Sequence, residues 1–183
     1  MRTLIVYESM YGNTHEVAEQ IGKGVEELGD TQVVPVHDAT PDLIAWADLV
    51  IVGGPTHAHG MTSSSTRKAA REAADKPGSE VEMDPEAGGQ GLRDWFGALS
   101  KVETKRAAAF DTRVDAAAVL TGRASNGIAR RLRSHGFSLV TKQESFLVDK
   151  HNRLVDGEAE RAMKWGLQLA HDLHAGASPH TKL

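Results

Sequence analysis

The 183-residue sequence contains no cysteine. This absence excludes disulfides, thiolate-based metal sites and a cysteine nucleophile. Long apolar runs are also missing. The N-terminal apolar segment, residues 4–6, is too short for the core of a signal peptide, and no segment approaches the length needed to cross a membrane. We therefore expect a cytoplasmic protein without a membrane-embedded part.

Neither sign of charge is in large excess. The chain carries 21 Lys and Arg against 25 Asp and Glu, a formal net charge of -4 at pH 7. Such a weak bias does not call for a nucleic-acid partner, and it leaves a protein partner open. The length fits one domain with a substantial core, which we assign to residues 1–175, with 176–183 as a mobile C-terminal tail.

Short apolar runs alternate with amphipathic segments along the chain. The predicted strands are residues 4–7, 33–36, 49–52, 105–110 and 137–140. The clearest predicted helices are residues 17–28, 125–135 and 158–173. A polar stretch, 75–91, is expected to be a long loop that does not pack. Apolar strands alternating with helices indicate right-handed βαβ units, so we predict an α/β fold with a doubly wound, five-stranded parallel sheet.

Glycines in and after the predicted helices have expected structural roles. Gly136 follows the helix over 125–135, where a left-handed residue would end it. Gly22 and Gly24 lie inside the first helix. They do not complete a dinucleotide-binding fingerprint, because Glu27 interrupts it and no strand precedes them. We expect these two glycines to let the helix pack closely on the sheet.

The loop after the first predicted strand is the most informative segment, and a helix follows it at once. Its residues are Ser9, Met10, Tyr11, Gly12, Asn13 and Thr14. Backbone N–H groups and a helix N-terminus then surround one point, which suits a phosphate group. The loop has no Lys or Arg, whereas a P-loop needs a lysine to reach the outer phosphates of a triphosphate. The predicted ligand is therefore a single phosphate monoester, held by N–H groups, hydroxyls and the helix dipole.

This loop and its flanks resemble the phosphate-binding signature of the flavodoxins. The matching pattern is Ile5-Val6-Tyr7-x-Ser9-x-x-Gly12-x-Thr14-x-x-x-Ala18-x-x-Ile21. The resemblance covers nearly the whole chain and implies the strand order 2-1-3-4-5, with FMN bound outside the carboxyl ends of the strands. In such proteins the flavin carries the electron chemistry, and the polypeptide binds and tunes it.

The resemblance implies that two further loops contact the flavin ring. The loop after the third predicted strand contains Pro55, Thr56, His57 and Ala58. The loop after the fourth, a weaker match, contains Asp111, Thr112 and Arg113. Arg113 is either a cation beside the ring, which would favour an anionic reduced flavin, or an ordinary surface arginine.

The sequence gives less support to metal binding and to hydrolase chemistry. His57 and His59 are spaced as metal ligands can be, but no third ligand accompanies them, so we predict no metal site. Residues 63–66 are Ser-Ser-Ser-Thr. Because the G-x-S-x-G setting of a hydrolase nucleophile is missing, we interpret them as the start of a helix.

The predicted function is that of an FMN-binding, flavodoxin-like electron-transfer protein whose partners are a reductase and an acceptor. A carrier is favoured over a stand-alone oxidoreductase, because the loops offer no acid or base catalyst. Two alternatives stay open. One is a flavodoxin-like NAD(P)H:quinone or FMN reductase, and the other is a flavin-free interaction module of the same fold.

Overall fold

The computed structural model describes residues 1–177 and contains one sheet. Its strands are β1 (Thr3–Tyr7), β2 (Thr31–Pro35), β3 (Leu49–His57), β4 (Gly60–Met61), β5 (Lys105–Val114), β6 (Phe137–Leu139) and β7 (Glu144–Val148). The order is β2-β1-β3-β5-β6; β4 pairs with β3 in the antiparallel sense, and β7 pairs with β5 in the parallel sense. The doubly wound parallel sheet and the order of its five main strands are confirmed.

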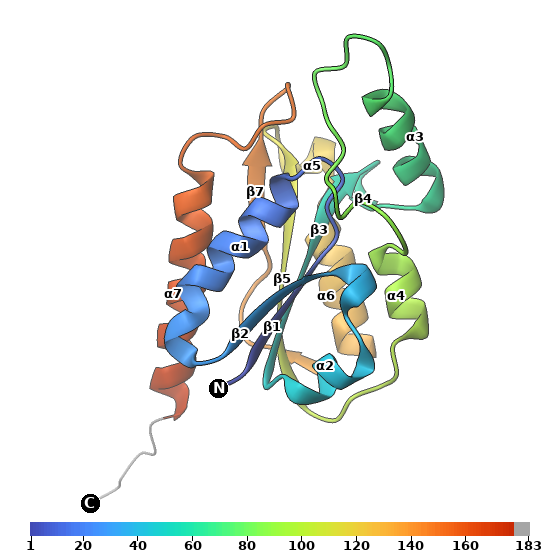
Figure 1. Cartoon of the computed structure of the whole chain (residues 1–183). Coiled ribbons are helices and arrows are strands. Elements are labelled where there is room, and N and C mark those ends of the chain that lie inside the picture. The colour runs from blue at the N-terminus through green and yellow to red at the C-terminus, as the bar shows by residue number, and fades with distance from the viewer. Residues whose placement is uncertain (178–183) are drawn as a thin grey trace, which may run out of the picture.

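Helices cover both faces of the sheet, with α1 and α7 on one side and α2, α4 and α6 on the other (Figure 1). The α-helices are α1 (Asn13–Val25), α2 (Pro41–Trp46), α3 (Ser64–Ala74), α4 (Leu92–Ala98), α5 (Ala118–Thr121), α6 (Ala124–Ser134) and α7 (Glu158–Ala177). Two 3-10 turns, η1 (Glu26–Leu28) and η2 (Val36–Asp38), flank β2. These two layers of helices explain why β1 and the first part of β3 read as continuous apolar runs, since both faces of each strand are buried.

Small residues allow the middle of the sheet to pack tightly. The phenyl ring of Phe110 on β5 occupies the space where a Cβ on Gly53 of β3 would lie. Gly22 in α1 faces β2, where a Cβ would stand 2.9 Å from Val33 Cγ2. This agrees with the expected close packing of α1 on the sheet. The prediction for Gly24 was wrong, because Gly24 faces α7 and not the sheet.

The last part of the sheet is longer than the sequence indicated. β6 pairs only with Lys105–Ala107, at the amino end of β5. After a short irregular segment the chain returns as β7 and pairs with Phe110–Val114. The predicted single strand over 137–140 is therefore followed by a second strand beside the same neighbour, and β7 extends the sheet to the carboxyl end of β5.

The structure bears on two further predictions, the helix stop at Gly136 and the C-terminal tail. Gly136 follows α6 with a φ of 91°, which confirms the left-handed helix stop. α7 continues to Ala177, so the first two residues of the predicted tail are helical. The remainder of that tail lies outside the described residues. Within residues 1–177, no helix combines the length and apolarity that a membrane span requires.

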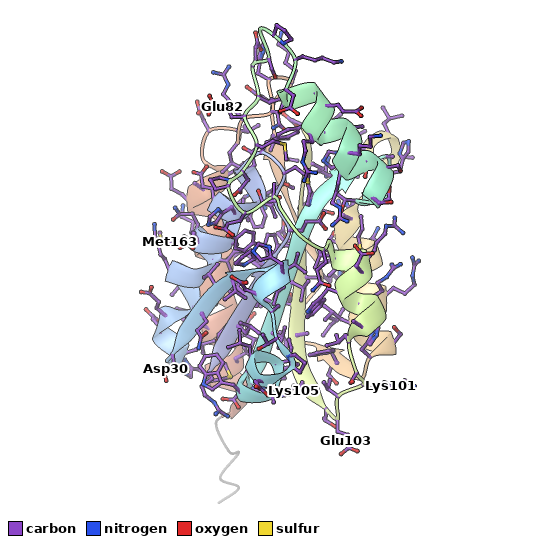
Figure 2. The ribbon with its side chains drawn as sticks, turned by 45° about the vertical axis from the view of Figure 1, so that its right-hand side comes forward. Asp30, Glu82, Lys101, Glu103, Lys105 and Met163 are labelled. Atoms are coloured by element: carbon purple, nitrogen blue, oxygen red, sulfur yellow. The ribbon has the colours of Figure 1, made fainter. Side chains whose placement is uncertain are left out.

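The long loop over 75–91 is irregular as predicted, but the expectation that it does not pack was wrong. It rises at the end of the molecule where Glu82 is labelled (Figure 2). The N–H of Asp84 donates to the carbonyl of Met10 at 2.8 Å, and Asp84 is only 5% exposed. The Asp84 carboxylate also lies 3.4 Å from Nδ1 of His15 in α1. The loop is thus attached to the segment that joins β1 to α1.

Candidate functional site

A cavity of about 240 Å³ lies outside the carboxyl ends of β1, β3 and β5. It is lined by Ser9, Met10, Tyr11, Asn13, Thr14, Pro55, Thr56, His57, Ala58, Thr112, Arg113, Val114, Val148 and Asn152. Eleven of the thirteen residues predicted for the site are in this set. The structure therefore brings the three predicted loops together at the place where open α/β sheets bind ligands.

The first loop turns sharply at Gly12 and presents the start of α1 to the cavity. Gly12 has a φ of 90°, a conformation that glycine adopts without a steric penalty, and its N–H donates to Ser9 Oγ at 3.1 Å. No side chain caps α1. The first backbone N–H groups of the helix consequently lack partners within the helix and point toward the cavity end, where they favour an anion.

Thr14 and Asn13 connect the first loop to distant parts of the chain. The hydroxyl of Thr14 is hydrogen-bonded to that of Thr112 at 2.7 Å in a buried position, which joins α1 to β5. The side-chain amide of Asn13 donates to the carbonyl of Asn152 at 2.9 Å. Asn152 belongs to the turn after β7 and has a φ of 58°. This turn therefore closes one side of the cavity.

Val114, Val148 and Asn152 line the cavity but were not predicted. Val114 is the last residue of β5, and β7 brings Val148 and the following turn with Asn152 beside it. A signal was present in the sequence: the short apolar run Phe146–Val148 is followed by Asp149, whose carboxylate accepts from the N–H groups of His151 and Arg153. Such Asp-centred turns commonly follow strands.

The electrostatics of the cavity favour an anionic ligand. Among residues 1–177, no carboxylate and no lysine lines it, and Arg113 is its one charged side chain. The Arg113 guanidinium donates from Nη1 to the carbonyls of Val114 and Ala116, at 3.2 and 2.6 Å. Its Nε is buried without a partner, as is the Nδ2 of Asn152. Arg113 Nε and Asn152 Nδ2 are therefore further hydrogen-bond donors for an anion, besides the N–H groups at the uncapped start of α1.

The second loop is a tight hairpin between β3 and β4, in which His57 pairs with Gly60. Its two central residues, Ala58 and His59, have φ values of 46° and 69°. Such turns normally use Asn-Gly, so this backbone is strained. A bridge between His59 and Gly122 attaches the turn to the segment before α6. The strain is therefore maintained by contacts outside the hairpin.

His57 is half-buried at the cavity wall. Burial lowers the pKa of its imidazole below the ordinary value of 6.5, and the negative charge of Glu8 opposes the shift without cancelling it. The ring is accordingly neutral at pH 7. Among residues 1–177, no three His, Asp or Glu side chains gather closely enough to hold a metal ion.

The half-buried His57 predicts a pH dependence of stability. In the unfolded chain a histidine takes up a proton near pH 6.5, whereas in the folded protein His57 takes it up only at lower pH. The unfolded state then binds more protons, so the free energy of unfolding decreases as the pH falls from about 7 toward 5. Urea denaturation across this range should show a smaller decrease for His57→Gln than for wild type. The exposed His174→Gln is the control, and an H57Q profile parallel to wild type would contradict the assignment.

Gly12 and Asp111 were predicted site residues but do not line the cavity. Gly12 makes the turn of the first loop through its positive φ. Asp111 is fully buried on the opposite face of β5 from Thr112, because neighbouring side chains of a strand alternate. Its carboxylate accepts from the N–H of Ser125 at 2.7 Å and so holds the start of α6. Burial raises the pKa of Asp111, and the Ser125 hydrogen bonds partly oppose that rise.

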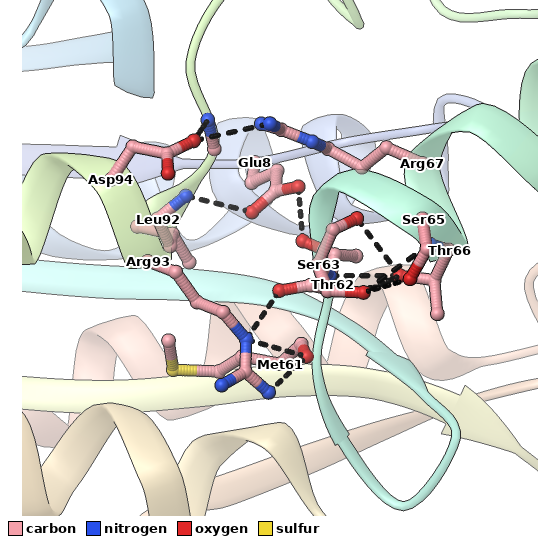
Figure 3. A network of polar contacts seen from close by, with 11 residues as sticks. Glu8, Met61, Thr62, Ser63, Ser65, Thr66, Arg67, Leu92, Arg93 and Asp94 are labelled. Carbon is pink, nitrogen blue, oxygen red and sulfur yellow. Dashed lines mark hydrogen bonds and ion pairs between the residues drawn. The ribbon is translucent and has the colours of Figure 1, made fainter.

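Glu8 is a buried polar residue that the sequence analysis missed. It follows β1 and is 5% exposed. Its carboxylate accepts from the N–H of Leu92 at 2.9 Å and from the hydroxyl of Thr62, as Figure 3 shows. These bonds connect the end of β1 to the start of α4 and to the segment after β4. Glu8 therefore stabilises the segment after the β3–β4 hairpin and does not line the cavity.

A larger cavity of about 370 Å³ lies at the other end of the sheet, between α2 and α4. Apolar side chains such as Ile44 and Trp95 form much of its wall, and Lys105, labelled in Figure 2, lies at its edge. It is at the amino end of β5, whereas ligands of this type of sheet bind at the carboxyl ends. We therefore assign the candidate site to the smaller cavity.

Comparison with known proteins agrees with the fold. The sequence model of the family described as Flavodoxin matches residues 5–160. A flavodoxin of Aquifex aeolicus (strain VF5) is 36% identical over 58 residues, a match that spans only 31% of this chain and 31% of that relative.

Two solved structures share the fold over nearly their whole length. A flavodoxin from the domain Archaea has a TM-score of 0.64 and 22% identity, with 95% of this chain and 99% of that chain covered. Flavodoxin 1 from Bacillus cereus has a TM-score of 0.64 and 18% identity, with 93% and 98% covered. At these identities the likeness of the structures concerns the fold alone.

Proposed function

This chain belongs to the flavodoxin family, and on that premise we propose that it is a cytoplasmic, FMN-binding electron-transfer protein. The observation that carries the proposal is the loop from Ser9 to Thr14. It leads into the uncapped start of α1, at a cavity that no carboxylate within the described part of the chain lines. That arrangement suits a phosphate monoester, which FMN carries at the end of its ribityl chain.

The residues around the cavity fit the whole of FMN. Ser9 and Thr14 lie at the phosphate end, beside the N–H groups of the first turn of α1. When the Thr112 hydroxyl donates to that of Thr14, the Thr14 hydroxyl can itself donate to the phosphate. Val114, which is 50% exposed, gives apolar surface to a flat ring, and the unpaired Nε of Arg113 can donate to a ring carbonyl. FMN would supply the reversible uptake of electrons when bound.

Within this site the polypeptide binds and orients the cofactor and limits the access of water. The neutral His57 would place no charge next to the ring, so Arg113 is the one cation that the described residues 1–177 contribute to the cavity wall. Without a strong acid or base directed into the cavity, the chain is suited to passing electrons between a reductase and an acceptor protein.

Two experiments separate this function from its alternatives. Flavin released from the purified protein should be FMN, and a colourless protein with no affinity for FMN would instead indicate a flavin-free interaction module.

A carrier should oxidise NADPH slowly alone and faster with an added flavoprotein reductase. Rapid NADPH oxidation with a quinone by the protein alone would favour a stand-alone reductase.

Thr14 provides a test of the phosphate loop. Thr14→Val keeps the shape of the side chain but removes its hydroxyl, and it should weaken FMN binding by about 1–3 kcal/mol, since hydrogen bonds to charged groups contribute that much. Thr14→Ser retains the hydroxyl and is the matched control, with an expected change below about threefold. Quenching of flavin fluorescence gives the affinities. Equal losses in both variants would show that the hydroxyl does not contact the ligand.

A further inference from the structure

A second pocket, of about 320 Å³, lies on the other side of the β3–β4 hairpin. Its lining includes Met61, Asn126 and four arginines, Arg93, Arg123, Arg130 and Arg131. Four arginines thus face one hollow, although the chain as a whole has a net charge of -4. The concentration of positive charge is local and follows from the fold, because these arginines come from α4 and from the start and middle of α6.

These guanidinium groups are not neutralised within residues 1–177. The arginines that form ion pairs there are Arg2, Arg67, Arg153 and Arg161. The carboxylate next to Arg93 in the sequence, Asp94, is directed to Arg67 at 3.1 Å. Burial, followed by the like charges of Arg93 and Arg130, lowers the pKa of Arg131. The pocket therefore holds an unbalanced positive potential.

Hydrogen bonds hold part of this arrangement in place. Arg93 donates from Nε to the carbonyl of Thr62 at 2.6 Å and from Nη2 to that of Met61 at 2.8 Å, as Figure 3 shows. Arg131 lies 3.9 Å from the sulfur of Met61. The Asn126 side chain accepts from Gln143 through its oxygen, which leaves its amide nitrogen available to donate. A preformed set of donors of this kind needs little reorganisation to receive an anion.

The position of the pocket links it to the candidate FMN site. His57 and Ala58 line the first cavity, whereas His59 and Gly60 of the same hairpin line the second. The two hollows are separated by a single turn of backbone. A ligand held in the second pocket would lie beside the loop that contacts the flavin ring in the proposed function.

We propose that the pocket between α4, α6 and the β3–β4 hairpin is a binding site for a phosphate group. Guanidinium forks match phosphate oxygens in pairs, and several arginines around one hollow suit a dianion better than a single carboxylate. The phosphate has two possible sources, a free inorganic phosphate or the phosphate of a nucleotide coenzyme. The site does not depend on FMN, so it stands or falls independently of the proposed function.

The test is calorimetric titration of the full chain with inorganic phosphate, ADP-ribose and 2′-phospho-ADP-ribose. Arg123→Gln and Arg130→Gln should each weaken binding about tenfold, because each removes charge-assisted hydrogen bonds. Arg133→Gln is the matched control: Arg133 is an exposed arginine of α6 outside the pocket, and its loss should change affinity by less than about twofold. In a Thr14→Val background, Arg123→Gln and Arg130→Gln should reduce probe binding by the same factor as in wild type, which separates this pocket from the first loop.

Comparison of the three probes identifies the source of the phosphate. Similar affinities for inorganic phosphate and 2′-phospho-ADP-ribose support a free anion, and at least tenfold tighter binding of the nucleotide supports a coenzyme. The proposal is overturned if no probe binds, or if R123Q and R130Q bind the probes as R133Q does. Binding of poly-glutamate without binding of any phosphate probe would also overturn it, in favour of an acidic protein partner.

Discussion

Gly24→Ala should lower the free energy of unfolding by about 3 kcal/mol, at the upper end of overpacking costs. A Cβ at Gly24 would stand 2.7 Å from the backbone N of Leu167 and 2.9 Å from Cα of Gly166, and it would overlap the carbonyl of Met163. These atoms belong to the backbone of α7, which cannot rotate away as a side chain would. The two helices would have to separate and lose buried apolar contact.

Gly97→Ala is the matched control for this experiment. Gly97 also lies in a helix, α4, but a Cβ there would meet no atom within 4 Å. Alanine is the better helix former, so this variant should be more stable than wild type by up to about 1 kcal/mol. Urea denaturation followed by circular dichroism gives both values. A Gly24→Ala variant within about 1 kcal/mol of wild type would show that α1 and α7 do not cross so closely.

FMN should bind at least about a hundredfold more tightly than riboflavin, which lacks the phosphate, because two or more charge-assisted hydrogen bonds are lost together. The donors are the hydroxyls of the Ser9–Thr14 loop and the uncapped N–H groups of α1. The preference should decrease as ionic strength rises, since part of it is an interaction between charges. Equilibrium fluorescence titrations of the flavin-free protein with each ligand measure it.

The Thr14→Val variant makes the riboflavin comparison specific. Riboflavin has no phosphate to contact the Thr14 hydroxyl, so its affinity should be the same for wild type and Thr14→Val, while that of FMN falls. The ratio of the two affinities should therefore shrink in the variant. Equal affinities of wild type for FMN and riboflavin would remove the basis for placing a phosphate at this loop.

The first loop of the site, Ser9–Thr14, could be predicted because the residues that determine its structure lie close together in the sequence. A strand buried on both faces must be apolar throughout, which identified β1 and β3. The sharp turn into α1 requires a residue with positive φ, and Gly12 supplies it. The carboxyl ends of parallel strands meet at one edge, so the loops after β1, β3 and β5 were expected to form one site.

Contacts between distant segments decided the rest. β7 and the turn at Asn152 enter the site because the chain returns to β5 after leaving β6. The local pattern indicates a strand and a turn there, but it does not specify the strand with which β7 pairs. Asp111 stands next to Thr112 in the sequence, but the alternation of the strand turns it toward α6. Gly24 is required by the backbone of α7, some 140 residues later in the chain.

The sequence by itself therefore determined the fold class, the strand order through the family resemblance, and most residues of the phosphate-suited cavity. The tertiary structure decided which of the neighbouring side chains face that cavity, how closely α1 and α7 approach, and that Arg93 and Arg123 meet in a second pocket. The physical reason is the range of the interactions. Helix starts, turns and strand burial leave local patterns, whereas side-chain clusters depend on which elements the finished sheet places next to each other.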